Sequence, residues 1–209
     1  MNMKTADWLV KEDGICRLCK SVREWDLLAE EYRLYRFLTE VEDNMRLAVT
    51  EQRDEETLLS GLRMLVRKLV LNCYTVKTRL PEPNENGGVS VVVLHDEVGF
   101  PMTIQTEMSL PGTTSHIHNH GTWGVVMVLQ GKQKNTFWRR TPTDKFPDKI
   151  DRVGERIIEP GDIISFTTEA IHSIEAVGDE PTITFNLYGE THGGKRYQFD
   201  FDKQTAKHF

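Results

Sequence analysis

The chain has 209 residues, 38% hydrophobic and 28% charged, which is ordinary for a globular protein and enough for one well-formed core. Its net charge of −6 argues against a surface that binds nucleic acid or an anionic membrane. The sequence contains no run of about 18 apolar residues, so a transmembrane helix is not expected.

The opening stretch MNMKTADWLVKEDG carries acidic residues where a signal peptide needs apolar ones, so we expect a cytoplasmic protein rather than an exported one. Three cysteines, at 16, 19 and 73, are too few for a disulfide framework. Cys16 and Cys19 form a CxxC motif, but no second pair of ligands follows at the spacing of a zinc site. We expect this motif to lie in a helical region, as reduced and partly buried thiols without a role.

Residues 1–72 are predicted to form a helical segment. An apolar stripe at three- and four-residue spacing predicts one amphipathic helix, and it consists of Trp25, Leu28, Tyr32, Tyr35 and Leu38. A second helix is predicted over 54–72, where acidic residues come first and basic ones late, as the helix dipole favours. Its apolar stripe consists of Leu58, Leu62, Leu65 and Leu69.

From about residue 73 the pattern changes to short strands. Runs rich in Val, Ile, Thr and aromatic residues, bounded by turn-forming residues, occur at 89–95, 102–108, 123–131, 135–140, 161–166 and 182–189. Many short strands in succession predict a sandwich or barrel rather than a parallel βαβ sheet. We therefore expect the segment 1–72 to pack on a β-barrel of residues 73–209, within one compact domain.

The stretch SHIHNHGTWG places histidines at 116, 118 and 120, and GDIISFTTEAIH ends on His172 after a later strand. Residues two apart on a strand point the same way, so His118 and His120 can face one side. Two histidines from one hairpin and a third from a distant strand can meet on a metal and leave coordination positions open for catalysis. His116 is expected to border the site, with a role as substitute ligand as the alternative.

These two blocks resemble the two signature motifs of the cupin superfamily, whose members are small double-stranded β-helix barrels. The spacing of the first motif is kept by Gly112, His118, His120 and Gly131. In the second motif Gly161 and His172 match. Gly124 stands where most cupins have a glutamate ligand. The resemblance implies a mainly β, jelly-roll-like cupin barrel with N-terminal α-helices.

A set of three neutral imidazoles leaves the charge of a divalent ion uncompensated, and therefore favours an anionic ligand such as a thiolate. The three-histidine set and the run HNHGTWG resemble the thiol dioxygenases, which bind Fe(II) and oxidise cysteine or 3-mercaptopropionate to the sulfinic acid with O2. The resemblance implies a mononuclear non-haem iron thiol dioxygenase, with O2 as cosubstrate. Affinity for divalent ions rises from Mn to Cu, so Ni, Zn or Mn could replace iron in the purified protein.

The run TFNLYG at 184–189 resembles a family strand that carries an active-site tyrosine. The resemblance implies that Tyr188 hydrogen-bonds near the oxygen and the substrate, with Thr184 and Asn186 on the same face. Asn186 stands where the family has a histidine, and it can still hydrogen-bond to the tyrosine and orient it.

The substrate carboxylate is expected to need an arginine, which binds carboxylates in a bidentate manner. The run YGETHGGKRY resembles that of the mercaptopropionate enzymes and implies Arg196 for this role. Arg79 is a second candidate, because cysteine-specific enzymes use an arginine that precedes the first motif. Trp123 contacts the substrate in one interpretation and packs in the barrel in the other.

Two other functions stay open. Three-histidine sites also occur among diketone-cleaving cupins, so a C–C-cleaving dioxygenase or an isomerase is one alternative, which an apolar cavity without arginine would favour. A non-catalytic metal-dependent binding or sensor protein is the other. The expected partner is a small thiol, with neither nucleic acid nor membrane, and the chain is expected to be a monomer or a homodimer.

Overall fold

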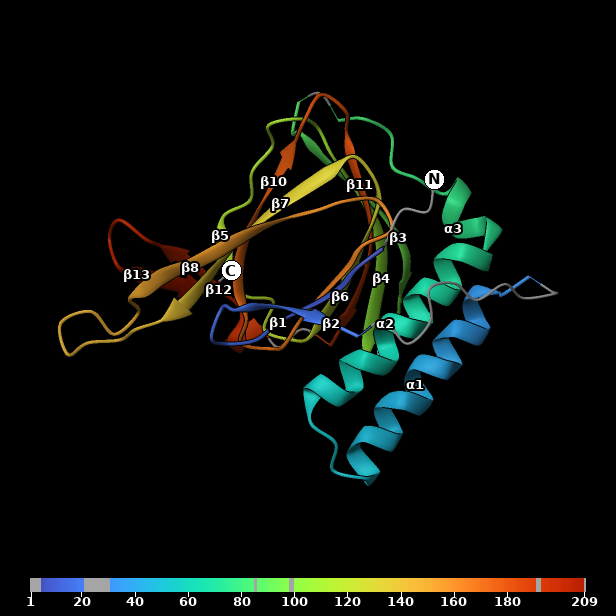
Figure 1. Cartoon of the computed structure of the whole chain (residues 1–209), viewed down its shortest axis with the longest axis horizontal. Coiled ribbons are helices and arrows are strands. Elements are labelled where there is room, and N and C mark those ends of the chain that lie inside the picture. Colours follow the sequence, from blue (N-terminus) through green and yellow to red (C-terminus); the bar gives the residue numbers. More distant parts are fainter. Residues whose placement is uncertain (1–4, 21–30, 85, 98–99, 191–192, 209) are drawn as a thin grey trace.

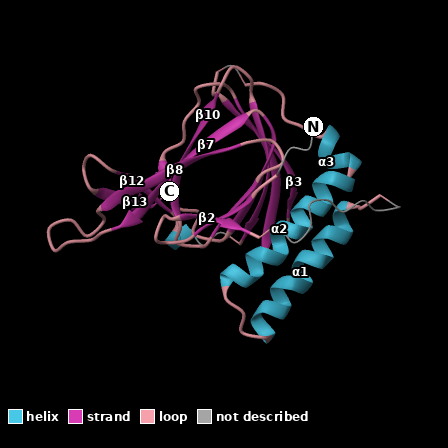
Figure 2. Ribbon diagram, in the orientation of Figure 1, coloured by secondary structure: helices cyan, strands magenta, loops and turns pink. Residues whose placement is uncertain are grey.

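The computed structural model describes residues 5–20, 31–84, 86–97, 100–190 and 193–208. Two β-sheets face each other, and the long helices lie side by side against one of them (Figures 1 and 2). The prediction of a mainly β, barrel-like fold with helices in the N-terminal third is confirmed. In the described part of the chain, no helix is long and apolar enough to cross a membrane.

The first described elements are strands, not helices. β1 (Asp7–Val10) and β2 (Cys16–Cys19) form an antiparallel hairpin, and β1 also pairs in parallel with β9 (Ile163–Phe166). The prediction of helix over the whole of residues 1–72 is therefore wrong at its start. Strands of four residues are too short to show a clear alternation, and here a partner more than 150 residues away selects the strand conformation.

The CxxC motif forms β2, so its predicted place in a helical region is wrong as well. Positions three apart on a strand face opposite sides, and Cys16 and Cys19 pack against different core clusters. Both are free and half-buried thiols, as predicted. Burial raises the pKa of Cys16 to about 11 and also raises that of Cys19, so both are protonated at neutral pH.

Three helices follow: α1 (Leu34–Thr50), α2 (Glu55–Asn72) and the short α3 (Tyr74–Thr78). The predicted helix over 54–72 is confirmed as α2. The Asp54 carboxylate caps it by accepting a hydrogen bond from the Thr57 backbone N–H at 2.9 Å, and two glutamates occupy its first turn. Its predicted stripe is half-buried at Leu58 and buried at the other three positions, Leu62, Leu65 and Leu69.

The stripe predicted for the first helix does not match the buried face of α1. Trp25 and Leu28 lie outside the described residues. Tyr32 is buried ahead of the helix, whereas Tyr35 is 64% exposed. The buried positions of α1 are Phe37, Val41 and Ala48.

The first sheet has the strand order β2-β1-β9-β6-β11-β4-β3, and the second has the order β13-β12-β5-β10-β7-β8. The further strands of the first sheet are β3 (Val89–Asp96), β4 (Met102–Ser109), β6 (Gly124–Gln130) and β11 (Thr182–Gly189). The second sheet consists of β5 (Ile117–His118), β7 (Lys132–Arg140), β8 (Ile150–Ile158), β10 (Ile171–Val177), β12 (Tyr197–Asp200) and β13 (Thr205–His208). All six predicted strands are present.

Side chains along β11 alternate between an apolar face of the sheet and a polar one. Phe185 and Leu187 belong to a large core cluster that joins the helices to the outer face of the first sheet. The residues between and beside them, Thr184, Asn186 and Tyr188, point to the inner face and line a cavity between the sheets. A second core cluster around Val126, Val128, Phe137 and Phe166 fills the rest of the space between the sheets.

Candidate metal centre

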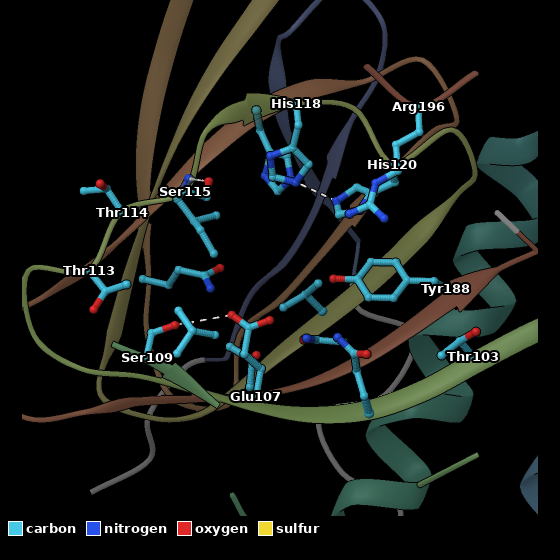
Figure 3. Close-up of a pocket in the computed structure, with 18 of the residues that line it drawn as sticks. Thr103, Glu107, Ser109, Thr113, Thr114, Ser115, His118, His120, Tyr188 and Arg196 are labelled. Atoms are coloured by element: carbon cyan, nitrogen blue, oxygen red, sulfur yellow. Dashed lines mark hydrogen bonds between the residues drawn. The ribbon is translucent and has the colours of Figure 1, made fainter. Parts of the chain in front are cut away.

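The three predicted ligand histidines all line the cavity, and Figure 3 labels two of them, His118 and His120. His118 on β5 is directly opposite His172 on β10, and His120 follows in the loop after β5. Their potential ligand atoms all lie within 4.8 Å of one another. His116, by contrast, has an exposed side chain and is not part of this group of the described residues.

The spacing of the ring nitrogens fits a shared cation. The Nε2 atoms of His120 and His172 lie 2.9 Å apart. Two nitrogens bound to one metal at about 2.1 Å, with an angle near 90° between the bonds, are separated by about 3.0 Å. Two lone pairs at this distance repel each other unless a proton or a metal ion lies between them. The three histidines are therefore arranged so that they could hold a metal ion through three ring nitrogens.

Hydrogen bonds on the other ring nitrogens orient two of these histidines. His118 Nδ1 donates to the His116 carbonyl at 2.9 Å, and His172 Nδ1 donates to Asn135 Oδ1 at 3.0 Å. Asn135 in turn donates to Gln133 Oε1 at 3.1 Å, and both residues come from β7, which pairs with β10. A proton held on Nδ1 leaves the Nε2 lone pair for a metal.

The electrostatic surroundings keep the three imidazoles neutral. Burial is the main reason that the pKa of His118 is lowered and that the pKa values of His120 and His172 lie well below the ordinary value. The positive charge of Arg196 further lowers the pKa of His118 and His120. Neutral imidazole is the form that binds metals, so these groups are ready for an ion without losing a proton first.

Gly124 and Tyr188 lie directly opposite each other on β6 and β11. A Cβ atom at position 124 would lie 2.9 Å from Tyr188 Cδ1 and 3.0 Å from Cε1, closer than ordinary carbon contacts. The ring of Tyr188 stacks on His120, with the centroids 4.8 Å apart and the planes 29° apart. The tyrosine ring therefore occupies the space that a side chain at position 124 would need, and it lies against a candidate ligand.

The other two predicted residues of β11 line the same cavity. Thr184 and Asn186 are buried beside Tyr188, whose hydroxyl points into the cavity (Figure 3). No hydrogen bond joins Asn186 to Tyr188 within the described residues, and Asn186 Oδ1 has no partner there. Tyr188 is positioned by Gly124 and His120 instead. Burial raises the pKa of the Tyr188 hydroxyl, which stays protonated at neutral pH.

Of the three predicted substrate-binding residues, the structure brings only Arg196 into the cavity, next to the short helix η1 (Gly193–Lys195). Arg79 is exposed at the end of α3, and its carbonyl accepts a hydrogen bond from the Thr106 hydroxyl at 3.0 Å. Trp123 is buried in the core cluster that joins the helices to the first sheet. The structure therefore places neither Arg79 nor Trp123 in the lining of the cavity, and Trp123 packs in the core.

The cavity has a volume of about 390 Å³, and most of its described lining residues are polar. A polar row on β4, the strand paired with β11, also lines the cavity and is not predicted from the sequence. It consists of Thr103, Gln105, Glu107 and Ser109. The alternation of these residues with Met102, Ile104 and Met108 was a usable signal for an inward polar face. Gln133 and Asn135 are not predicted either, because the polar and charged residues around them on β7 show no such alternation.

No family model and no curated protein sequence matches the chain. Its structure is similar to an oxalate oxidase in complex with the substrate analogue glycolate, with 16% identity, 55% of this chain and 57% of that chain covered, and a TM-score of 0.42. It is similar to a cupin superfamily protein from Desulfitobacterium hafniense, with 16% identity, coverage of 52% and 83%, and a TM-score of 0.40. It is also similar to the Schizosaccharomyces pombe Cnp3 cupin domain, with 11% identity, coverage of 56% and 72%, and a TM-score of 0.42. The chain thus covers little more than half of the oxalate oxidase.

Proposed function

We propose that this protein is a mononuclear non-haem iron thiol dioxygenase that converts a small thiol and O2 into the corresponding sulfinic acid, R–SH + O2 → R–SO2H. The observation that carries the proposal is a three-histidine group without a carboxylate, in which the place of the missing side chain at 124 is filled by the Tyr188 ring. A protonated phenol beside the candidate ligands suits a reaction in which sulfur gains oxygen.

The residues that would hold Fe(II) are His118, His120 and His172, through the nitrogens that their hydrogen bonds leave free. When bound, the iron would supply the coordination positions for thiolate and O2 and the redox chemistry that joins them. A neutral ligand set leaves the ionic charge uncompensated, and this supports an anionic sulfur ligand. These three neutral histidines thus favour a substrate atom with a negative charge.

The remaining side chains bind and orient the substrate. Arg196 pairs with a carboxylate, for which its planar guanidinium is suited. Tyr188 donates a hydrogen bond from its protonated hydroxyl into the cavity. The phenol ring stacks on His120 and fills the space beside Gly124, which fixes its position. Its hydroxyl can therefore donate a hydrogen bond without reorganisation at the moment of reaction.

The character of the cavity favours a thiol acid over a diketone. A cupin that cleaves an apolar diketone is expected to have an apolar cavity without arginine. Here Arg196 is close enough to influence two of the histidines, and threonines, serines, glutamine and asparagine make up much of the lining. These features support the thiol acid as substrate.

The test is an oxygen-electrode screen of Fe(II)-loaded protein with cysteine, 3-mercaptopropionate and cysteamine, with metal analysis of the protein as isolated and detection of the sulfinate by mass spectrometry. Turnover of at least one of these thiols is expected. His172→Ala should abolish metal binding and turnover, whereas His116→Ala, which removes an exposed ring and keeps the backbone carbonyl, should keep both. Metal binding without turnover of any small thiol would overturn the proposal and favour a binding or sensor protein.

The role of Arg196 has its own test and a matched control. Arg196→Gln should raise the KM for 3-mercaptopropionate about a hundredfold, because a bidentate charged pair is lost. Lys195→Gln removes an exposed charge one residue away and should change KM little. An equal effect of both substitutions would show that long-range charge, rather than binding by Arg196, sets the affinity.

A further inference from the structure

Glu107 is the only acidic side chain among the described residues that line the cavity. It comes from β4, on the wall that faces the histidines, and its carboxylate points into the open space (Figure 3). The Ser109 hydroxyl donates a hydrogen bond to its Oε1 at 3.3 Å. No ion pair within the described part of the chain neutralises Glu107.

The surroundings of Glu107 make an unpaired carboxylate costly. Burial raises its pKa, which shows that the charged form is poorly solvated there. The labelled side chains around Glu107 in Figure 3 carry neutral hydroxyl groups, and they belong to Ser109, Thr113, Thr114 and Ser115. Arg196, the cation of the lining, lies on the side of His120 (Figure 3). A cationic group of the substrate would stabilise the charged carboxylate of Glu107, which burial separates from water.

An acceptor without a hydrogen-bond partner among the described residues, Asn186 Oδ1, lies near Glu107. Asn186 is 2% exposed, it lines the cavity, and its Oδ1 has no hydrogen-bond partner within the described residues. On the ladder between β4 and β11, Asn186 is opposite Gln105, and Glu107 is opposite Thr184. Glu107 and Asn186 are therefore diagonal neighbours, about 7–8 Å apart between Cα atoms and within reach of one bound group.

We propose that Glu107 and Asn186 bind a cationic, hydrogen-bond-donating group of the substrate, of which an ammonium group is the simplest, on the wall opposite the metal centre. The inference rests on the proposed function: the sulfur lies at the histidines, and the amino group reaches across the cavity. The substrate class is then a thiol acid that also carries an amino group, with its carboxylate at Arg196 and its nitrogen away from the metal. A cavity of about 390 Å³ leaves room for such a chain, since a liquid water molecule takes about 30 Å³.

The experiment compares 4-aminobutane-1-thiol with 1-butanethiol, which has the same chain without the charge. Binding to Fe(II)-loaded protein is measured by anaerobic calorimetry at pH 8 for the wild type, for Glu107→Gln and for the control Glu180→Gln, which makes the same change at an exposed loop position. The wild type and the control should prefer the aminothiol by at least about tenfold, and Glu107→Gln should lose this preference. Asn186→Leu should lower the preference less than Glu107→Gln does, because only a neutral acceptor is removed.

Each outcome bears on one of the two proposals. A preference that survives in Glu107→Gln, or a wild type without any preference, overturns the assignment of Glu107. If neither thiol binds to the wild type, the metal-free protein decides the role of Glu107 by thermal stabilisation with butylammonium chloride against 1-butanol, and the oxygen-electrode screen decides the thiol dioxygenase proposal separately. Stabilisation by the ammonium ion that is lost in Glu107→Gln upholds the cation site, and equal stabilisation of both proteins, or none, overturns it.

Discussion

The contact between positions 124 and 188 makes Gly124→Ala the sharpest test of the site geometry. The substitution adds one methyl group at a point where its carbon would lie 2.9 and 3.0 Å from two ring atoms of Tyr188. Ordinary carbon contacts lie at about 3.5–4.0 Å, so the ring must move by roughly 0.5–1 Å. Such a movement disturbs the stack on His120.

The expected cost follows from this overlap. Overpacking in a filled region costs about 1–3 kcal/mol. A chain of about 200 residues loses about 2–4 °C in melting temperature per kcal/mol, so Gly124→Ala should lower it by about 2–12 °C. Gly154→Ala is the matched control on another strand, because no atom lies within 4 Å of the added carbon and its φ is outside the left-handed region. It should leave the melting temperature unchanged or raise it slightly.

The assay is a double-mutant cycle by urea unfolding, with Tyr188→Ala as the second substitution. In the Tyr188→Ala background, Gly124→Ala should cost less than about 0.5 kcal/mol, so the coupling energy should recover most of its cost in the wild type. Metal affinity, measured by titration, should fall in Gly124→Ala alone. An additive cycle, or a Gly124→Ala protein as stable as the Gly154→Ala control, would refute the account of Tyr188 as the group that fills position 124.

Three further outcomes follow from the hydrogen bonds and charges of the fold. Asn135→Ala removes the acceptor that fixes His172 Nδ1 and should weaken metal binding about 10–100-fold in a titration, without a change in the ligands themselves. Arg67→Met leaves the buried carboxylate of Asp7 without its ion pair and should lower the free energy of unfolding by about 3–5 kcal/mol in urea. Because burial raises the pKa of Glu107 above its ordinary value of 4.5, the folded state binds more protons than the unfolded state, and its stability falls as the pH rises. The melting temperature of Glu107→Gln should therefore exceed that of the wild type at pH 8, and the difference should vanish below about pH 4.5; a constant difference across this range would contradict the raised pKa.

Much of the barrel can be predicted from the sequence because its long strands alternate. The inner face of β11 can be predicted because Thr184, Asn186 and Tyr188 alternate with apolar residues. The start of helix α2 can be predicted from the acidic residues of its first turn. The hairpin of β1 and β2 is missed because each strand has four residues and depends on pairing with β9. Residues of β8 are missed because its mixed charges mask the strand pattern.

Some residues of the candidate site can likewise be predicted from the sequence, and others cannot. The three histidines are predictable because glycine-framed motifs place them, and the structure brings their nitrogens together. Arg79 and Trp123 lie outside the cavity, because Arg79 ends helix α3 ahead of the barrel strands and Trp123 packs in the core cluster beside the helices. Glu107 is missed because its role depends on the strand opposite, since only the pairing of β4 with β11 brings it beside Asn186.

The pairing of β1 with β9 also constrains the order in which the protein can fold. Residues 7–10 find their parallel partner only in residues 163–166, so this ladder closes a loop of more than 150 residues. The β1–β2 hairpin, in contrast, is local and can form as soon as residue 19 has been made. Contacts of such long separation slow folding, because chain entropy is lost before they contribute stability. We therefore expect the edge of β9 to be among the last parts of the barrel to be covered during folding.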